Sequence, residues 1–338
     1  MSFELLAHFR GFASRPANRA KVHLLFSLVA ASLAAGCQPR SAAGGLSAPS
    51  PWLCGVIPDG VALPGPASVV QLRLFTNASP DGSHLFNTFD LEAFGETLLR
   101  SPARAPFGPL TGVPPWDKTL HHILINGTGP ELAAANSMRL VEQASGPEWR
   151  YWAWDLTGAY RGRVRTLRRA VVFVEPDLFV FYDRLVAPEP VSFDMLLHPP
   201  SITVLDTNWG DLRLDLPKAG LRIHSPAPKG FLRPWSRVSS SADTLLPDTV
   251  TMRLGPTNRV SELDLLTVLV VYPAGGVQGF AFKFLESPTA LGARIHRQHL
   301  PTLVAFRTAS TAPVASLSTY EFTGPVGVAV FKPKPRSR

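Results

Sequence analysis

The clearest β-sheet signal in this chain is the segment HLFNTFDLEAFGETLL, which runs from His84 to Leu99. Phe89, Leu91 and Ala93 alternate with other residues, which places them on one face of an extended strand. Phe94-Gly95-Glu96 follows with the composition of a tight turn. The segment therefore predicts two short strands joined as a hairpin.

A second segment of the same kind, WDKTLHHILINGTG, runs from Trp116 to Gly129. Ile123-Leu124-Ile125 is a strand-like apolar run, and the Asn126-Gly127 dipeptide after it favours a two-residue hairpin turn. Histidines lie just ahead of the predicted strands in both segments. Imidazoles that two neighbouring strands bring to one edge can bind a metal ion or transfer a proton.

The rest of the chain continues this pattern of short strands and turns. The whole chain has 338 residues, of which 45% are hydrophobic and 17% charged, and its 33 prolines outnumber its 26 glycines. Many short strands with proline- and glycine-containing turns are typical of a sandwich or a barrel rather than a helical fold. We therefore expect an all-β chain, with a large antiparallel β-sandwich of the supersandwich type.

The predicted organisation has four parts. A signal segment at 1–36 is followed by a tether and irregular lead-in at 37–68, the sandwich at 69–331 and a basic tail at 332–338. A hairpin turn is predicted at Glu175-Pro176-Asp177, and a Ser-rich loop at 231–246. Strands are predicted at 69–75, 138–141, 149–156, 163–174, 179–185, 191–198, 201–205, 212–216, 221–224, 249–254, 263–272, 279–285, 302–307, 318–322 and 326–331.

The first 36 residues have the pattern of an export signal. Basic residues precede an apolar core from Val22 to Ala35, which is shorter than a membrane-spanning helix. The end of the segment, Leu33-Ala34-Ala35-Gly36-Cys37, resembles a bacterial lipoprotein cleavage box in which Cys37 accepts the lipid. The alternative is an ordinary secretory signal. Both predict export, and the first predicts an outer-membrane or periplasmic lipoprotein of the bacterial cell envelope.

The net charge of the chain bears on the class of ligand that it could bind. The formal net charge is +8, from 33 Lys and Arg against 25 Asp and Glu. This modest basic excess fits an acidic glycan or an anionic envelope surface, and it equally fits no specific ligand. No basic–aromatic pattern predicts nucleic-acid binding. The sequence contains no Gly-x-Ser-x-Gly, P-loop or dinucleotide fingerprint. The predicted sandwich contains no cysteine, which excludes thiolate metal sites there.

In order and spacing, the motifs resemble those of the heparinase II/III-like polysaccharide lyases. Asn87-Thr88-Phe89 with Ala93-Phe94-Gly95-Glu96 is similar to the segment that opens the C-terminal β-sandwich of that family. His121-His122 with the following strand and turn resembles the family's strand that contains His and Asn. The likeness covers about residues 70–269 and includes further segments at 155–160, 168–177, 183–185 and 193–198.

The resemblance implies β-elimination on a uronate-containing glycan. In that reaction a base removes the proton at C5, neutralisation of the carboxylate makes that carbon acidic, and an acid protonates the leaving oxygen. The chain departs from the family ahead of the sandwich. In the family a helical toroid precedes the sandwich, whereas in this chain only a short segment precedes Val70. His84 is the single histidine of the first strand, and Ser101 stands where a metal-ligating Asp is common. These departures predict a degraded or rearranged site.

The resemblance assigns catalytic roles to His84, His121 and Tyr160. Because neighbouring residues of a strand point to opposite faces, only one of His121 and His122 can face a cleft, and His121 is expected to do so. His84, His121 and Asp117 could together hold zinc, although their pattern is not the usual one for that metal.

The substrate-binding candidates are Asn87, His198, Trp152 and Trp154. Trp152 and Trp154 share a strand face and could stack on sugar rings, although core packing is the favoured role. Structural hydrogen bonding is the main role expected of Tyr160 and His198.

Three functions are compatible with these features. The favoured one is an exported, lipid-anchored sandwich that binds an acidic polysaccharide with a degraded site, because half a cleft cannot orient a substrate against both acid and base. The second is a carbon–oxygen lyase that a separate toroid-bearing chain completes. The third is a structural envelope lipoprotein, since a fold does not establish a function.

Overall fold

The chain is built from antiparallel strands, which confirms the all-β prediction. The computed structural model describes residues 61–62, 69–75, 88–100, 122–131, 139–202, 204–206, 211–225, 232–237, 250–276, 280–297, 300–308 and 313–331. All of them belong to the unit Ser47–Arg338. These residues include one short 3₁₀ helix, η4 (Thr157–Tyr160), and none of their helices is long and apolar enough to cross a membrane.

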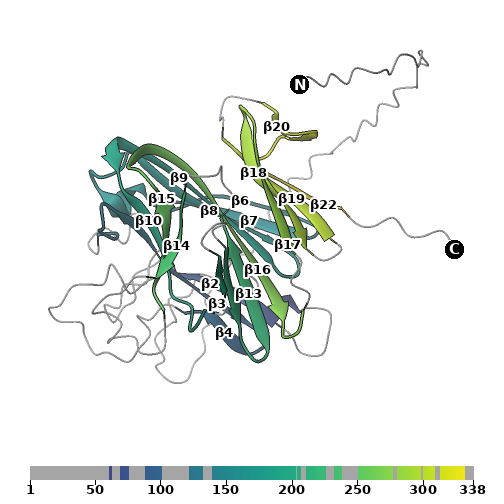
Figure 1. Cartoon of the computed structure of the whole chain (residues 1–338). Helices are drawn as coiled ribbons and strands as arrows, with labels where there is room; N and C mark the ends of the chain where they lie inside the picture. Colours follow the sequence, from purple (N-terminus) through teal and green to yellow (C-terminus); the bar gives the residue numbers. More distant parts are fainter. Residues whose placement is uncertain are drawn as a thin grey trace, which may run out of the picture. The chain divides into compact units, whose positions relative to one another are not determined.

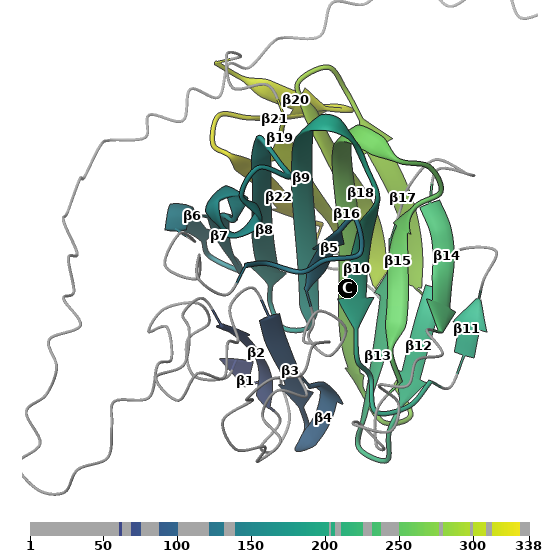
Figure 2. The same ribbon diagram turned by 90° about the vertical axis from the view of Figure 1, so that its left-hand side faces the viewer.

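The central sheet has eight strands in the order β11-β12-β13-β16-β9-β8-β7-β6, and each pairs antiparallel with its neighbours (Figure 2). The bounds of its strands are β6 (Arg139–Gly146), β7 (Trp149–Asp155), β8 (Thr166–Val174), β9 (Leu178–Val191), β11 (Val204–Asp206), β12 (Asp211–Asp215), β13 (Ala219–His224) and β16 (Val260–Pro273).

Four smaller sheets surround it. The N-terminal sheet contains β1 (Val61–Ala62), β2 (Val69–Phe75), β3 (Thr88–Ala93) and β4 (Glu96–Leu99). The inner sheet, in the order β14-β15-β10-β5, contains β5 (Ile123–Ile125), β10 (Phe193–Leu197), β14 (Leu232–Arg237) and β15 (Met252–Pro256). The C-terminal sheet contains β17 (Phe280–Glu286), β18 (Ala290–Arg297), β19 (Leu300–Arg307) and β22 (Val326–Val330). β20 (Ala315–Leu317) and β21 (Tyr320–Phe322) form a separate hairpin.

Strand alternation sorts the side chains of the central sheet into two cores. Val171 of β8 joins the first core, together with Leu91 of β3 and Met195 of β10. Its neighbour Val172 points to the opposite face and joins the second core, together with Phe306 of β19. The central sheet therefore lies between the N-terminal and inner sheets on one side and the C-terminal sheet on the other (Figure 1).

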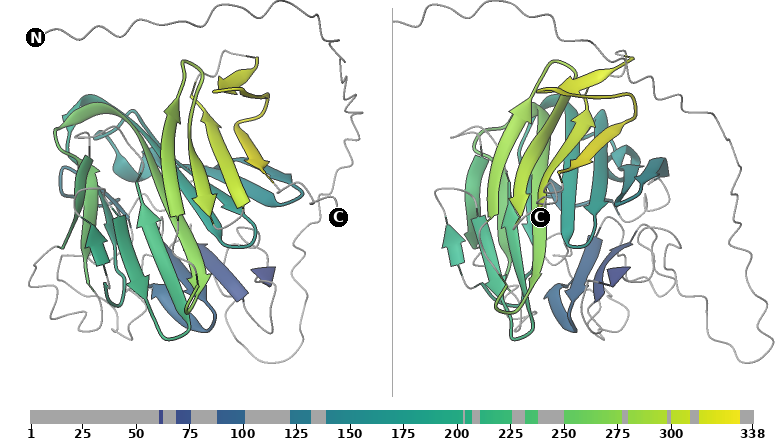
Figure 3. Two further views of the ribbon diagram at one scale, coloured as in Figure 1. Left: turned by 45° about the vertical axis from the view of Figure 1, so that its right-hand side comes forward. Right: turned by 90° about the vertical axis from the view of Figure 1, so that its right-hand side faces the viewer.

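A third, smaller core lies on the outer face of the C-terminal sheet. Ala290 of β18 and Ala305 of β19 pack there against Leu317 of β20 and Phe322 of β21. The hairpin formed by β20 and β21 therefore covers one end of that face (Figure 3, yellow).

Three predicted turns are confirmed. At Phe94-Gly95 the φ angles are 53° and 78°, and at Asn126-Gly127 they are 54° and 75°. Two successive positive φ angles characterise the type I′ turn, and Gly, Asn and Asp adopt it most readily. The third turn is Glu175-Pro176-Asp177, which joins β8 to β9 and contains a cis peptide bond before Pro176.

One predicted loop was wrong, and strand β18 was missed. The predicted loop at 231–246 contains strand β14, which pairs with β15. Strand β18 was not predicted, because Ala290, Gly292 and Ala293 have low β-propensity and no hydrophobic alternation marks them as a strand. Pairing with β17 and β19 on both sides makes this segment a strand.

The central sheet contains a fully buried ion pair. Nε of Arg169 on β8 donates to Asp183 on β9 at 2.7 Å, and Nη2 donates to the second carboxylate oxygen at 3.0 Å. The two side chains are only 2% and 1% exposed. Asp183 lies within strand β9, where it neutralises a buried cation.

Candidate functional site

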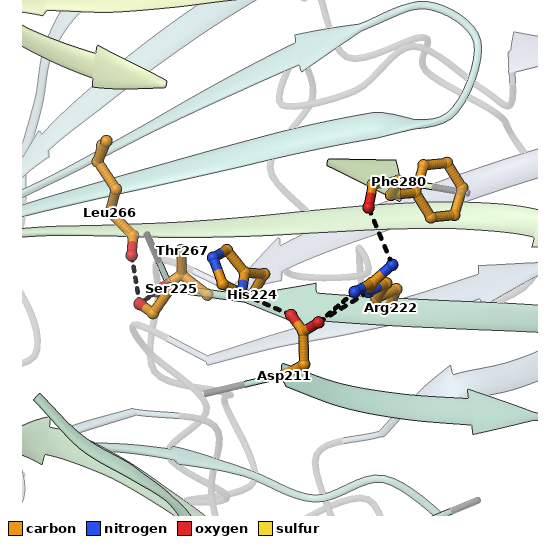
Figure 4. Close-up of polar contacts among 7 residues, drawn as sticks. All are labelled: Asp211, Arg222, His224, Ser225, Leu266, Thr267 and Phe280. Atoms are coloured by element: carbon orange, nitrogen blue, oxygen red, sulfur yellow. Dashed lines mark hydrogen bonds and ion pairs between the residues drawn. The ribbon is translucent and has the colours of Figure 1, made fainter. Parts of the chain in front are cut away.

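A polar cluster lies on β12 and β13, on the face of the central sheet that β17 adjoins. Leu212 and Ile223 point into the first core, so the residues that alternate with them point to the opposite face. Asp211, Arg222 and His224 lie there (Figure 4). We name these three residues the Asp211 cluster.

An imidazole and a carboxylate form the centre of the Asp211 cluster. Asp211 and His224 are directly opposite each other in the register of β12 and β13. Nδ1 of His224 lies 2.5 Å from Oδ1 of Asp211. Both side chains are 13% exposed. A carboxylate that binds Nδ1 orients the imidazole ring and leaves Nε2 as the nitrogen that can interact with a ligand.

Arg222 binds the second oxygen of the same carboxylate. Its Nε donates to Oδ2 of Asp211 at 3.1 Å, and Nη2 contacts the same oxygen. Its Nη1 donates to the carbonyl oxygen of Phe280 at 3.2 Å. One guanidinium thus connects β13 to β12 and to the edge strand β17.

Phe282 of β17 packs against the cluster. Its ring stacks on the His224 imidazole, with 4.6 Å between centroids and 18° between planes. The guanidinium carbon of Arg222 lies 5.5 Å from the centroid of the same ring. Stacking and the cation–π contact limit the rotamers of both polar side chains.

The electrostatics keep Asp211 ionised at neutral pH. Burial raises the pKa of this carboxyl, but hydrogen bonds from His224 and Arg222 and the charges of these two residues outweigh burial. They hold the pKa below its ordinary value of 3.8. With the carboxylate fixed on Nδ1, the cluster can accept or donate a proton at Nε2 of His224, or hydrogen-bond a ligand there.

A second polar group on β12 borders the cluster. Arg213 forms an ion pair with Asp215 at 2.8 Å. The hydroxyl of Tyr272 on β16 donates to Asp215 at 2.9 Å. Burial, followed by the hydrogen bond to Asp215 and its charge, raises the pKa of Tyr272 to about 12. The phenol therefore remains a hydrogen-bond donor at neutral pH.

Of the residues predicted from sequence, Tyr160 and His198 are buried. The Tyr160 hydroxyl donates to the carbonyl oxygen of Ile123 at 2.6 Å, which connects η4 to β5. Nδ1 of His198 lies 3.2 Å from the hydroxyl of Thr251. These contacts match the structural hydrogen bonding that the sequence favoured, and the catalytic role of Tyr160 and the substrate-binding role of His198 stay predictions.

Trp152 and Trp154 share a face, as the alternation predicted, and this face belongs to the first core. They are 6% and 3% exposed. Burial of this extent favours core packing, because it leaves almost none of either ring for a sugar to stack on.

The remaining predicted site residues, namely His84, Asn87, Asp117, His121 and Cys37, lie outside the described residues. Their assignment to catalysis, substrate, zinc and lipid therefore stays a prediction. Within the described ranges, no three or more His, Cys, Asp and Glu side chains are grouped so as to hold a metal ion.

The sequence did not single out the Asp211 cluster. Asp211 and His224 are 13 residues apart and are brought together only by the register of two strands. The available signal was the alternation of Leu212 and Leu214 on one strand and of Leu221 and Ile223 on the next. It predicts that the polar residues between them share a face.

Solved structures of heparinase-type lyases are similar to part of this chain. A mutant of the heparan sulfate lyase HepC from Pedobacter heparinus matches with a TM-score of 0.51 and 10% identity, over 75% of this chain and 39% of that one. A heparinase III with methylated lysines matches with a TM-score of 0.51 and 11% identity, over 78% of this chain and 38% of that one.

This chain shares its fold with part of the heparinase-type lyases. At such low identity the likeness shows the fold alone, and the chain spans about 39% of the length of the lyase it matches. No protein-family model matches the chain, and neither does any curated protein.

Proposed function

We propose that this chain is an exported β-sandwich protein that binds an acidic polysaccharide. The observation that carries the proposal is the fold it shares with lyases whose names refer to heparan sulfate and heparin. The part they share is a set of sheets that can keep a glycan-binding surface whether or not the rest of a lyase is present. On this proposal, the matched part corresponds to the C-terminal sandwich of those lyases.

The charge of the chain supports an acidic ligand. The whole chain has a formal net charge of +8, and residues 37–338, which follow the proposed signal, carry +5. A basic surface attracts a polyanion and raises its local concentration. Because exposed charges are screened by salt, the attraction should weaken as ionic strength rises.

The sequence supports two further parts of the proposal, which are export and membrane attachment. The basic and apolar pattern of residues 1–36 supports export to the bacterial cell envelope. The small residues before Cys37 support lipid attachment at that cysteine, which would place the protein at the outer membrane or in the periplasm.

A second candidate function is β-elimination by this chain together with a separate toroid-bearing chain. The oriented imidazole of His224 favours it, because proton abstraction needs a base of this kind. If neither binding nor elimination occurs, the remaining hypothesis is a structural role in the envelope.

Binding to heparan sulfate, with neutral dextran as the control, tests the proposal. We expect the purified chain to bind heparan sulfate at low salt, to release it as salt rises and to ignore dextran. The ultraviolet absorbance of unsaturated uronate, followed in the same mixture, should stay flat. A rise would mean that the chain is itself a lyase, and absence of binding at every salt concentration would refute the proposal.

A further inference from the structure

The outer face of the C-terminal sheet carries a group of exposed basic side chains. Phe282 of β17 and Ile295 of β18 point into the second core, so their neighbours along each strand point outward. Lys283 lies directly opposite Arg294, and His296 lies in the next outward row of β18. These three side chains are all exposed.

The same two rows continue across β19 and β22. One contains Leu303 and Ala329. The other contains Pro301 and Phe331, whose N–H donates to the carbonyl oxygen of Pro301 at 2.8 Å. Phe331 is 46% exposed. We name the surface formed by Lys283, Arg294, His296 and Phe331 the outer platform.

Among the described residues, acidic partners distinguish other cations from Lys283 and Arg294 of the outer platform. Arg168 forms an ion pair with Glu142, and Arg184 forms one with Asp264. Among the described residues, no ion pair with a carboxylate involves the platform cations, and the two rows contain no Asp or Glu. Within the platform, the Arg294 guanidinium makes a cation–π contact, with its carbon 5.8 Å from the Phe331 ring centroid.

We infer that the outer platform binds a carboxylated or sulfated segment of an acidic polysaccharide, an inference that rests on the proposed function. A guanidinium matches the geometry of carboxylate and sulfate oxygens, and an ammonium adds a second positive charge beside it. The exposed phenyl ring offers an apolar surface to the C–H face of a sugar.

The dimensions and the adjoining sequence fit such a ligand. β17 and β22 are separated by three inter-strand gaps, which is about 14 Å and accommodates a short oligosaccharide. The seven residues that follow Phe331 include four basic and no acidic ones. The positive charge therefore continues along the sequence beyond the platform.

A double substitution tests the outer platform in the full chain. Lys283→Gln with Arg294→Gln should weaken the Kd for heparan sulfate about tenfold, which corresponds to about 1.4 kcal/mol. The matched control is Arg161→Gln with Lys218→Gln, which removes the same charge from exposed positions on other elements. It should change the Kd less than about twofold, because charges far from a ligand are screened. Thermal unfolding of both variants checks that they fold.

The outcomes separate this inference from the proposed function. If the unsubstituted chain binds heparan sulfate and the platform variant binds equally well, the polysaccharide binds elsewhere and only the inference fails. Equal weakening in the control variant would also overturn it, since binding would then follow net charge. If the unsubstituted chain binds vesicles of phosphatidylglycerol but not heparan sulfate, the proposed function fails and the inference fails with it.

Discussion

Arg169 and Asp183 depend on each other, because both are charged and almost fully buried. Removing one charge from such a pair leaves the other without compensation in a medium of low polarity. We predict that Asp183→Asn lowers the free energy of unfolding by about 3–5 kcal/mol. Urea unfolding of the full chain measures the loss.

Arg139→Gln is the control for this prediction. Arg139 and Asp155 also form an ion pair between neighbouring strands, but their side chains are 73% and 30% exposed. Because exposed pairs contribute little, the loss should be under about 1 kcal/mol. Equal losses in the two variants would mean that burial does not set the cost of breaking a pair in this sheet.

The pairing of Asp211 with His224 shows what sequence cannot provide at the residue scale. Each residue is ordinary in its own strand, and only the register of β12 against β13 places imidazole and carboxylate side by side. A shift of one residue would move His224 to the face of Ile223, in the first core. The sequence motifs singled out histidines near recognisable turns, and His224 was not among them.

At the scale of elements, the sequence predicted best where local chemistry alone decides the conformation. The turn at Asn126-Gly127 was predictable because both residues tolerate positive φ. Strand β18 was not, because its small residues acquire a role only through the neighbouring strands. Gly292 is such a residue, since a Cβ there would lie 2.1 Å from the carbonyl oxygen of Val304 on β19.

We predict that Gly292→Ala destabilises the chain by about 1–3 kcal/mol, because the added methyl group must displace β19 or the hairpin of β20 and β21. The nearest hairpin atom, on Leu317, would be 2.8 Å away. Thermal unfolding and limited proteolysis of the hairpin measure the effect. In Gly324→Ala, the matched control, the nearest heavy atom is 3.5 Å away, so stability should stay within about 0.5 kcal/mol. Unchanged stability in Gly292→Ala would show that the two strands accommodate a methyl group.

At the scale of the whole molecule, the central sheet belongs to two cores at once. Val171 and Val172 are adjacent in sequence, yet one packs toward the N-terminal and inner sheets and the other toward the C-terminal sheet. Sequence predicted an antiparallel sandwich from many short strands. It could not predict how the sheets are layered, because strands buried on both faces lose the alternation that marks a single apolar face.

This shared sheet leads to a prediction about cooperativity. Phe306 of β19 is buried in the second core, where its ring lies 4.8 Å from that of Tyr182 on β9. Phe306→Ala should cost about 3–5 kcal/mol, as removal of a buried aromatic ring usually does. Because β9 also forms the first core, hydrogen exchange should accelerate in β2 and β3 as well as in β17 and β18.

Phe173→Ala, in the first core, is the reciprocal experiment and should accelerate exchange in the same strands. If Phe306→Ala instead accelerated exchange only in the C-terminal sheet, that sheet would unfold as a separate unit. The outer platform would then lie on a module that can open without the central sheet. Polysaccharide binding would in that case slow exchange in β17 and β18 alone, whereas a single cooperative unit requires it to slow exchange in the central sheet as well.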